Sequence, residues 1–396
     1  MRILHCYFFL FTLFNGLSTR AATLRDSTSR VKVAVFIPLY IDNVFEGYSY
    51  SLGKSNLPKN VLPGLEFYNG VTMAIDSLNS EGTAVEISIY DSKQSGETLQ
   101  QLFKKAEFNN VGLIIASITS PAELKVFSDE ALAKNIPVIS ATYPNNVGVT
   151  ANPFFVLLNS SFPAHIEGLY KYMQKYYSAN TIIAVTKKGA TEDYVKNYIT
   201  SLNKNVGSIP IKVKWVNVDE YQFTLANLEP MLDSTKSNVL FVASPSESFG
   251  LKIVKTISAA EKYRTTAIGM PTWDGIKELD SKSCRNVEVV FSTPFLYYSQ
   301  NPGLSAWVNQ QYKDKYSSRP SDMVFKGFET IYHFTKLLVK HRDSLINNLS
   351  DKDFTLFNQF NLEAVKIRKS SLKPDFLENR KLYFIKKQQG SVKSII

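Results

Sequence analysis

Cysteine is almost absent from this sequence, which has two cysteines among 396 residues. Cys6 lies in an N-terminal segment that we expect to be removed, and it lacks the small neighbours of a lipid-attachment site. Cys284 is then the one cysteine of the mature chain, so no internal disulfide can form there. We interpret Cys284, which precedes Arg285, as a structural residue rather than a reactive thiol. The mature chain therefore depends on its hydrophobic core for stability.

Long apolar runs are missing as well, except near the N-terminus. Arg2 is followed by the apolar segment 3–14 and by the small-residue sequence TRA at 19–21, which is typical of a secretory signal. The apolar segment is shorter than the ~20 residues that a transmembrane helix needs, and no later stretch reaches that length. We therefore expect a signal peptide at residues 1–21 and an exported, periplasmic chain that begins near Ala22 and does not span a membrane.

Positive charge is spread thinly along the chain. Removal of Arg2 and Arg20 with the signal leaves 43 of the 45 basic residues against 35 acidic residues, a net charge of +8. The lysines occur in scattered pairs, such as Lys104-Lys105 and Lys187-Lys188, and form no arginine-rich stripe with interleaved aromatic residues. This distribution is typical of a solvated surface, so we do not expect nucleic acid binding.

Motifs for catalysis and metal binding are also missing. The mature chain has three histidines, His165, His333 and His341, and no two of them have the His-x-x-x-His spacing of metal ligands. It contains no Gly-x-Ser-x-Gly elbow and no glycine-rich phosphate loop. A carboxylate pair for glycoside hydrolysis stays open, because such pairs are close only in space. We expect a protein that is not an enzyme and needs no metal or cofactor.

Strand and helix patterns alternate along the mature chain, whose length suits two domains. Apolar runs of strand length alternate with segments of helical periodicity, and this alternation predicts parallel βαβ units. The predicted strands are 31–38, 85–90, 111–116, 136–140, 181–185, 211–216, 239–243, 266–270, 287–291 and 381–385. The predicted helices are 64–80, 97–103, 164–177, 191–203, 223–232, 302–316 and 323–339, with another that begins at Pro121.

Two strand ends share a short motif. Ser120-Pro121-Ala122-Glu123 and Ser244-Pro245-Ser246-Glu247 each place serine before proline and glutamate three residues after that serine. Serine can be the helix N-cap, proline suits the first helical position, and glutamate at N3 completes a capping box. The motif predicts two strand-to-helix corners at the carboxyl edge of a parallel sheet, where such sheets bind ligands. Two matched corners indicate two similar lobes that face one cleft.

The segment from Tyr40 to Pro63 is longer than an ordinary βα connection and carries Phe45, Tyr48 and Tyr50. We interpret this segment as a functional or mobile loop. Its length and its aromatic residues make it a candidate contact for a partner protein.

Four stretches carry patterns of a known family. They are GLEFYNGVTMAIDSLNSEG at 64–82, the serine corner and the Ile-Pro-Val-Ile-Ser strand within 113–140, the segment 152–161, and the segment 293–338 with Trp307. Together they resemble the type I periplasmic solute-binding proteins of the branched-chain amino-acid-binding group. In the same order, they are similar to its first helix, its serine-bearing corner, its first crossover and its return to the first lobe. The resemblance spans nearly the whole mature chain.

The resemblance implies an α/β fold of two Rossmann-like lobes, each a parallel sheet flanked by helices, joined by three crossover segments. It implies a first lobe of residues 22–155 and 295–345 and a second lobe of residues 156–294 and 346–396. In such proteins the lobes close over a small solute. The resemblance therefore implies a solute-binding protein for an envelope transporter, with an amino acid or an amide-like compound as its ligand.

In that family the first lobe provides hydroxyls and backbone amides for the carboxylate of the ligand. By position, Ser120 and Thr142 match this side of the site, together with Thr119 and Ala141. The chemistry agrees, because a carboxylate at a helix N-terminus gains from the helix dipole and from charge-assisted N–H bonds. Two other interpretations stay open: Ser120 can serve as a helix cap alone, and the hydroxyl of Thr142 can bond its own backbone.

The second lobe of the family provides an acid for the ammonium of the ligand, and Asp274 matches this position. As the middle residue of Trp273-Asp274-Gly275, the acid can instead serve a turn. Ser246 matches a position where family members often have an aromatic residue. Tyr143 and Trp273 are candidates for stacking on the ligand, with packing in the core as the alternative.

A second possible function is a sensory or envelope-associated module whose closure signals to a partner protein. Some members of this fold serve as ligand domains of receptors, and the basic surface and the long Tyr40 to Pro63 loop suit a protein contact. A transporter gene nearby would favour the first function, and its absence would favour the second.

Overall fold

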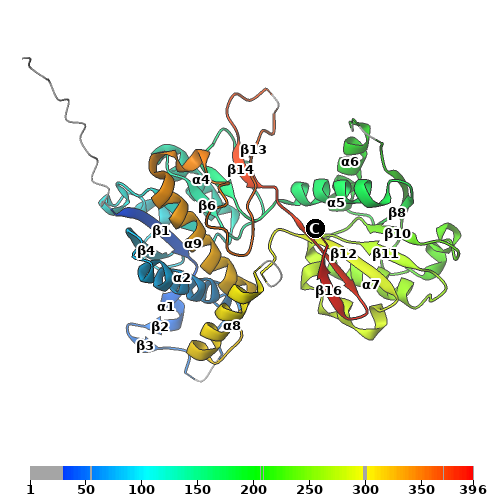
Figure 1. Cartoon of the computed structure of the whole chain (residues 1–396), viewed down its shortest axis with the longest axis horizontal. Helices are drawn as coiled ribbons and strands as arrows, with labels where there is room; N and C mark the ends of the chain where they lie inside the picture. Colours follow the sequence, from blue (N-terminus) through cyan, green and yellow to red (C-terminus); the bar gives the residue numbers. More distant parts are fainter. Residues whose placement is uncertain are drawn as a thin grey trace, which may run out of the picture.

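The fold is that of a computed structural model, which describes residues 30–53, 56–205, 207, 209–297, 301–368 and 370–395. The expected signal peptide, residues 1–21, lies outside these residues. The described chain forms two lobes that lie side by side, each built on a sheet of seven strands (Figure 1). Each described helix is too short or too polar to cross a membrane.

Seven strands form the sheet of the first lobe: β1 (Val31–Ile37), β4 (Val85–Asp91), β5 (Leu113–Ala116), β6 (Val138–Ser140), β7 (Phe155–Leu157), β13 (Leu362–Val365) and β14 (Phe376–Asn379). Their order is β13-β14-β7-β6-β5-β1-β4, and neighbouring strands run parallel except β13, which is antiparallel to β14. Because β1, β4, β5 and β6 are parallel, the loops that follow them meet at one edge of the sheet.

Helices cover both faces of this first sheet. They are α2 (Leu62–Ser80), α3 (Leu99–Leu102), α4 (Pro121–Lys134), α8 (Pro302–Tyr316) and α9 (Asp322–His341). Along β1 the side chains alternate, so Val35 packs toward α2 and α9 while Phe36 packs toward α4. The helices α2 and α9 touch at two glycines, Gly70 and Gly327, since a Cβ on Gly70 would lie 2.0 Å from the Val324 carbonyl oxygen.

The second lobe repeats this plan with β8 (Thr181–Thr186), β9 (Lys212–Asn217), β10 (Asn238–Val242), β11 (Thr265–Ile268), β12 (Val287–Thr293), β15 (Tyr383–Gln388) and β16 (Ser391–Ser394). The order is β16-β15-β12-β11-β10-β8-β9. The strands from β8 to β12 pair in parallel, whereas β15 and β16 add an antiparallel edge. The helices are α5 (Phe162–Tyr177), α6 (Ala190–Lys204) and α7 (Glu247–Ser258).

Short elements complete the described chain. The Tyr40 to Pro63 loop holds α1 (Ile41–Val44) and a hairpin of β2 (Phe45–Glu46) and β3 (Ser49–Tyr50). The 3₁₀ helices are Ala106–Phe108, Leu225–Asn227, Glu229–Met231, Pro271–Gly275, Lys277–Asp280, Lys282–Cys284 and Arg342–Asn347. Two of these 3₁₀ turns replace the helix expected at 223–232, where Pro230 has no N–H to continue an α-helical ladder.

Three crossovers join the lobes, as expected, but the last one lies further along the chain than expected. The first follows β7, the second follows β12, and the third connects β14 to β15. We expected residues 346–396 to lie in the second lobe. Strands β13 and β14 instead pair with the first sheet, so the chain crosses only after Asn379. The expected parallel sheets are therefore mixed, because the C-terminal segment adds antiparallel strands to both.

Hydrogen bonds tie the first and third crossovers to each other. The Ser161 N–H donates to Glu378 Oε1 at 2.8 Å, and the Ser160 hydroxyl donates to the Asn379 carbonyl oxygen at 2.7 Å. Arg380 forms an ion pair with Glu378 at 2.9 Å. This network holds the first and third crossovers together at the joint between the lobes.

The second crossover is tied to the first lobe by a buried carboxylate. Glu329 on α9 accepts hydrogen bonds from the Phe357 and Asn358 N–H groups, at 2.8 and 2.6 Å, and from Asn358 Nδ2 at 2.7 Å. Asn358 Oδ1 in turn accepts from the Leu296 N–H at 2.6 Å. Burial raises the pKa of Glu329 to about 7, even though these hydrogen bonds favour its charged form.

Candidate functional site

The first corner is formed by residues 117–123, between β5 and α4. Helix α4 begins at Pro121 with Ser120 as its N-cap, and Ser120 Oγ accepts from the Glu123 N–H at 3.3 Å. The expected capping box is only half formed. Glu123 Oε2 accepts instead from the Thr119 N–H and the Thr119 hydroxyl, at 2.8 and 2.9 Å, and Glu123 Oε1 pairs with Lys93 at 2.6 Å.

This corner keeps hydrogen-bond donors that other groups do not use. In the described part of the chain, the N–H groups of Ser120 and Thr142 have no acceptor. The Ala141 N–H, by contrast, donates to the Ala116 carbonyl oxygen at 2.9 Å, and the Thr142 hydroxyl donates to the Ile118 carbonyl oxygen at 2.9 Å. The corner therefore presents two backbone donors at the N-terminus of α4, with the Ser120 hydroxyl beside them.

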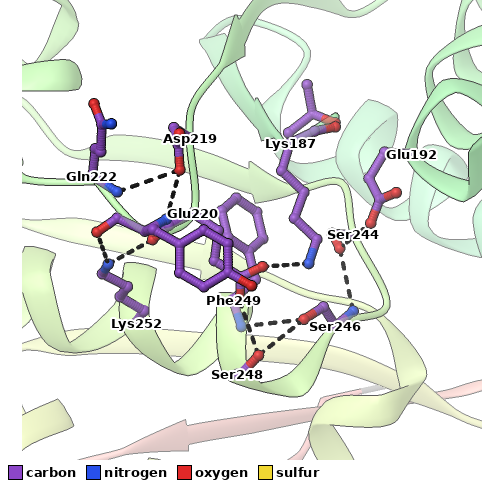
Figure 2. Close-up of polar contacts among 12 residues, drawn as sticks. Lys187, Glu192, Asp219, Glu220, Gln222, Ser244, Ser246, Ser248, Phe249 and Lys252 are labelled. Carbon is purple, nitrogen blue, oxygen red and sulfur yellow. Dashed lines mark hydrogen bonds and ion pairs between the residues drawn. The ribbon is translucent and has the colours of Figure 1, made fainter. Parts of the chain in front are cut away.

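The second corner, between β10 and α7, is built differently (Figure 2). Ser244 is completely buried, and its hydroxyl donates to Glu192 Oε1 at 2.5 Å. The Ser246 N–H donates to Ser244 Oγ at 3.2 Å, and Ser246 Oγ accepts from the Phe249 N–H at 3.4 Å. The expectation that Ser244 caps the helix is therefore wrong. Helix α7 begins at Glu247 with Ser246 as its cap, while the Ser244 hydroxyl binds Glu192.

Charged residues around the second corner are also paired with each other (Figure 2). Lys187 Nζ lies 2.5 Å from Glu220 Oε2, and the Ser248 hydroxyl donates to Glu220 Oε1 at 3.0 Å. The hydrogen bond from Lys187 is the main cause that lowers the pKa of Glu220. Lys252 Nζ donates to the Glu220 carbonyl oxygen at 2.5 Å. The polar groups of this corner thus bind one another, which leaves little for a ligand to bind.

A pocket of about 420 Å³ lies between the two lobes, next to the crossovers. We call it the interlobe pocket. Its lining residues are Pro144, Asn145, Asn159, Ser160, Phe162, His165, Pro271, Thr272, Asp274, Thr293, Pro294, Phe295, Tyr297, Asp322 and Lys326. The lining residue Asn159 is bonded to Thr142, because Asn159 Nδ2 donates to the Thr142 carbonyl oxygen at 2.8 Å. The lining residues come from both lobes, so a small molecule in the interlobe pocket would touch both.

Three ionisable side chains determine the charge of the interlobe pocket. Desolvation is the main cause that raises the pKa of Asp274, followed by the charge of Asp322, and desolvation also raises the pKa of Asp322. Both carboxylates touch solvent, but the walls of the pocket displace much of the surrounding water. Burial lowers the pKa of Lys326 to about 8.

The histidine of the pocket adds no charge. His165 is buried, its Nδ1 lies 2.8 Å from the Ser292 hydroxyl, and burial lowers its pKa to about 3. The described residues contain no group of histidines, cysteines and carboxylates that could hold a metal ion.

The structure brings some of the predicted site residues together and separates others. Thr119, Ser120, Ala141 and Thr142 lie together at the carboxyl ends of β5 and β6, but they do not line the interlobe pocket, whereas Asp274 does. Tyr143 packs against the core of the first lobe and does not line the pocket.

Two residues expected in the second lobe's part of the site have other roles. Ser246 caps α7. We expected Trp273 as a candidate for stacking on the ligand. It is instead fully buried in the core of the second lobe. The 3₁₀ turn Pro271–Gly275 directs the indole inward against Gly250 and Gly269, while its neighbour Asp274 faces the pocket.

The Tyr40 to Pro63 loop covers a separate cavity of about 570 Å³ at the β4 edge of the first lobe. Its lining is apolar except for Asp91, whose carboxylate accepts hydrogen bonds from the N–H groups of Leu39, Ile41 and Lys93 at 2.9 Å each. The described residues of the loop therefore pack on the first lobe.

Sequence reasoning missed Asp322 and Lys326. Both lie at the start of α9, within the stretch that carried the family resemblance, and both line the interlobe pocket. A signal was present, since Lys326 interrupts an otherwise apolar run of Met323, Val324, Phe325, Gly327 and Phe328. A lysine on the core side of an amphipathic helix needs a partner or a polar cavity.

Comparison with known proteins gives one family and many related structures. The sequence profile of the family described as "Periplasmic binding protein" matches residues 62–369. No curated protein matches the sequence. One similar solved structure, from Rhodospirillum rubrum, is described as a branched-chain amino acid ABC transporter. It has a TM-score of 0.64 at 13% identity, with 92% of this chain and 100% of that chain covered.

Two further structures have the same fold. An ABC transporter substrate-binding protein from Desulfitobacterium hafniense, in complex with Leu, has a TM-score of 0.55 at 11% identity and covers 93% of this chain and 100% of its own. A branched-chain amino acid ABC transporter periplasmic ligand-binding protein from Burkholderia xenovorans has a TM-score of 0.58 at 10% identity, with coverages of 93% and 95%. At these identities the similarity concerns the fold alone.

Proposed function

Because the chain belongs to the periplasmic binding protein family, matched over residues 62–369, we propose that it binds a small polar solute between its lobes for an envelope transporter. As a member of this family it is a binding protein and not an enzyme. The proposed solute is an amino acid or an amide-like compound. The observation that carries this proposal is a pocket lined by both lobes, with an acid, Asp274, on the second lobe and unused backbone donors at the nearby strand ends of the first.

The carboxylate of the solute is proposed to bind at the first corner. The N–H groups of Ser120 and Thr142 are available there, and the Ser120 hydroxyl can donate while its oxygen still accepts from Glu123. An anion at this place also gains from the N-terminal end of α4. Thr119 and Ala141 shape the corner, but their own N–H groups already donate to Glu123 and Ala116.

The ammonium of the solute is proposed to bind Asp274. This carboxylate lines the interlobe pocket and forms no ion pair with a described residue, although the charges of Lys387 and Lys326 act on it from a distance. A side-chain hydrogen bond with Thr293 already favours its charged form, and a ligand ammonium would favour that form further.

Binding to both lobes explains how the solute would close the cleft. A ligand shifts a hinge equilibrium only through contacts that differ between the open and closed states. The first corner belongs to the first lobe and Asp274 to the second, so a solute that bonds to both is held best when the lobes approach each other.

Native mass spectrometry of protein purified without denaturation, followed by thermal unfolding with the amino acids and their amides, tests this proposal. A ligand at 100 times its Kd stabilises the folded protein by about 2.7 kcal/mol, which corresponds to a rise in Tm of about 3 °C for a chain of this length. If no retained ligand is found and no amino acid or amide raises the Tm, the proposed ligand class is wrong.

The compartment and the partner belong to the same proposal. We propose that residues 1–21 are removed on export to the periplasm, which intact mass measurement of the secreted protein would detect. The partner is proposed to be a membrane transporter. The alternative, a signalling partner, would be indicated if the ligand-loaded protein bound a receptor domain and no transporter subunit in a cross-linking experiment.

A further inference from the structure

Lys326 places an ammonium group in the interlobe pocket without a hydrogen-bond acceptor or ion-pair partner among the described residues. The side chain leaves α9 between buried apolar residues, and protein surrounds it on most sides. In the described chain Lys326 makes no hydrogen bond and no ion pair at contact distance. Its Nζ lies 4.0 Å from the centroid of the Phe295 ring, so a cation–π contact holds it in place. A cation that is withdrawn from water and unpaired is ready to bind an acceptor.

The charged and titratable groups around Lys326 do not accept a hydrogen bond from its ammonium group. Asp322 and Glu329 lie on the same helix, Asp274 faces it from the second lobe, and His165 on α5 is neutral. The Glu329 carboxylate is already used by hydrogen bonds from residues 357 and 358. Asp322 precedes Lys326 by four residues, which makes the two side chains neighbours on one face of α9. They nevertheless form no ion pair.

Asp322 and Lys326 lie on adjacent turns of α9 and form no ion pair. The Asp322 carboxylate can accept hydrogen bonds, and the Lys326 ammonium can donate them. A primary carboxamide matches this arrangement, because its carbonyl oxygen accepts from an ammonium and its NH₂ group donates to a carboxylate. A carboxylate side chain would be repelled by Asp322. An apolar side chain would leave Lys326 without an acceptor when the pocket closes.

We propose that Asp322 and Lys326 are specificity-determining residues, which bind the side-chain carboxamide of an amino-acid ligand. This inference rests on the proposed function and extends it. The α-carboxylate lies at the first corner, the α-ammonium lies at Asp274, and the third polar group of the ligand reaches α9. The ligand class is then an amino acid with an amide side chain, such as glutamine or asparagine.

Isothermal titration calorimetry with the whole mature chain tests the assignment. The probes are L-glutamine, L-glutamate and L-homoleucine, whose side chains have nearly the same shape and differ in their polar ends, with asparagine, aspartate and leucine as the shorter set. We expect the wild type to bind one of the two amides at least tenfold more tightly than its apolar counterpart, because buried polar groups reject a ligand that leaves them unpaired.

Variants separate the two side chains. Lys326→Met is expected to weaken binding of the amide at least tenfold and to change binding of the apolar analogue by less than twofold. Asp322→Asn is expected to reduce the preference for the amide over the corresponding acid. Lys326→Arg keeps the charge and should retain most of the preference. Lys336→Met is the matched control, because Lys336 lies on the same helix but pairs with Glu81 at the surface.

Two results would overturn the inference. If Lys326→Met weakened binding of the amide and of the apolar analogue equally, Lys326 would have only a structural role. If the wild type bound the apolar analogues as well as the amides, the carboxamide assignment would be wrong while the proposed function would stand. Failure of every amino acid to bind would contradict both. Thermal unfolding of each variant, with Lys326→Arg as the conservative replacement, shows whether a loss of affinity is a loss of fold.

Discussion

The first corner at Ser120 and the second corner at Ser244 have the same Ser-Pro-x-Glu sequence at the same place in their lobes. At the first, Ser120 caps α4 and its N–H group stays available to a ligand. At the second, the Ser244 hydroxyl donates to buried Glu192, and the cap moves two residues on to Ser246. The carboxylates that bind at the two corners also differ: Glu192 comes from α6, far away in sequence, whereas Glu123 belongs to the first corner itself.

This comparison teaches that a capping motif defines a corner but not its use. A serine hydroxyl can bond to its own helix or to another element, and at the second corner it donates to a glutamate far away in sequence. We infer that the first lobe binds through its corner and the second through Asp274, one strand beyond its own corner.

The largest expected effect is a loss of ligand affinity when Asp274, the proposed binding group of the second lobe, is replaced. Asp274→Asn keeps the shape of the side chain and removes its charge. The ligand ammonium would then lie between the closed lobes without its carboxylate partner. This should weaken binding by about 2–5 kcal/mol, or roughly 30-fold or more. Titration calorimetry with the ligand found by thermal unfolding measures this. An affinity that stayed within twofold of the wild type would exclude Asp274 from the site.

Ser244→Ala should separate stability from binding. The substitution leaves Glu192 Oε1 and the Ser246 N–H without their partner in a buried place, which should cost about 1–3 kcal/mol of unfolding free energy. Chemical denaturation measures that cost, and ligand affinity should be unchanged when it is determined well below the Tm. A loss of affinity without a loss of stability would show that the second corner does bind the ligand.

At the first corner, Ser120→Ala should lower both the stability of the protein and its affinity for the ligand. Removal of the N-cap oxygen should destabilise the protein by about 1 kcal/mol, and loss of the hydroxyl donor should weaken binding by a similar amount, roughly fivefold. Ser120→Thr, which keeps a hydroxyl, serves as the control. If Ser120→Ala changed stability alone, Ser120 would be a cap and nothing more.

The smallest expected effect is on pH dependence. Backbone N–H donors at the first corner do not titrate in the physiological range, whereas Lys326 has a pKa of about 8. A ligand that needs the charged lysine binds with nearly constant affinity below that pKa and more weakly as the pH rises through it. Affinity for the amide should therefore fall about twofold between pH 7 and pH 8. In Lys326→Arg this fall should disappear, since arginine stays charged.

Sequence patterns predicted the regular parts of the fold well, because local periodicity determines them. The strands that became β1, β5 and β10 and the helices that became α2 and α9 were expected within a few residues of their observed bounds. Where the chain crosses between lobes was not predictable in this way, since the pairing of 362–379 with the first sheet depends on contacts distant in sequence.

The candidate site was predictable only where a motif marks it. Ser120 and Thr142 follow recognisable strands, and Asp274 follows from the family resemblance. Trp273 has the same sequence context as Asp274 but faces the core, because one turn of 3₁₀ helix sends adjacent side chains in different directions. Asp322 and Lys326 became candidates only when α9 was seen to line the interlobe pocket.

Small-angle X-ray scattering of the mature protein, with and without a saturating ligand found by thermal unfolding, tests the central claim most directly. If the ligand bridges the first corner and Asp274, the radius of gyration should fall on binding in the wild type and in Ser244→Ala. It should stay at the ligand-free value in Asp274→Asn at a concentration that still saturates the first lobe. A bound ligand that left the wild-type radius of gyration unchanged would contradict the account.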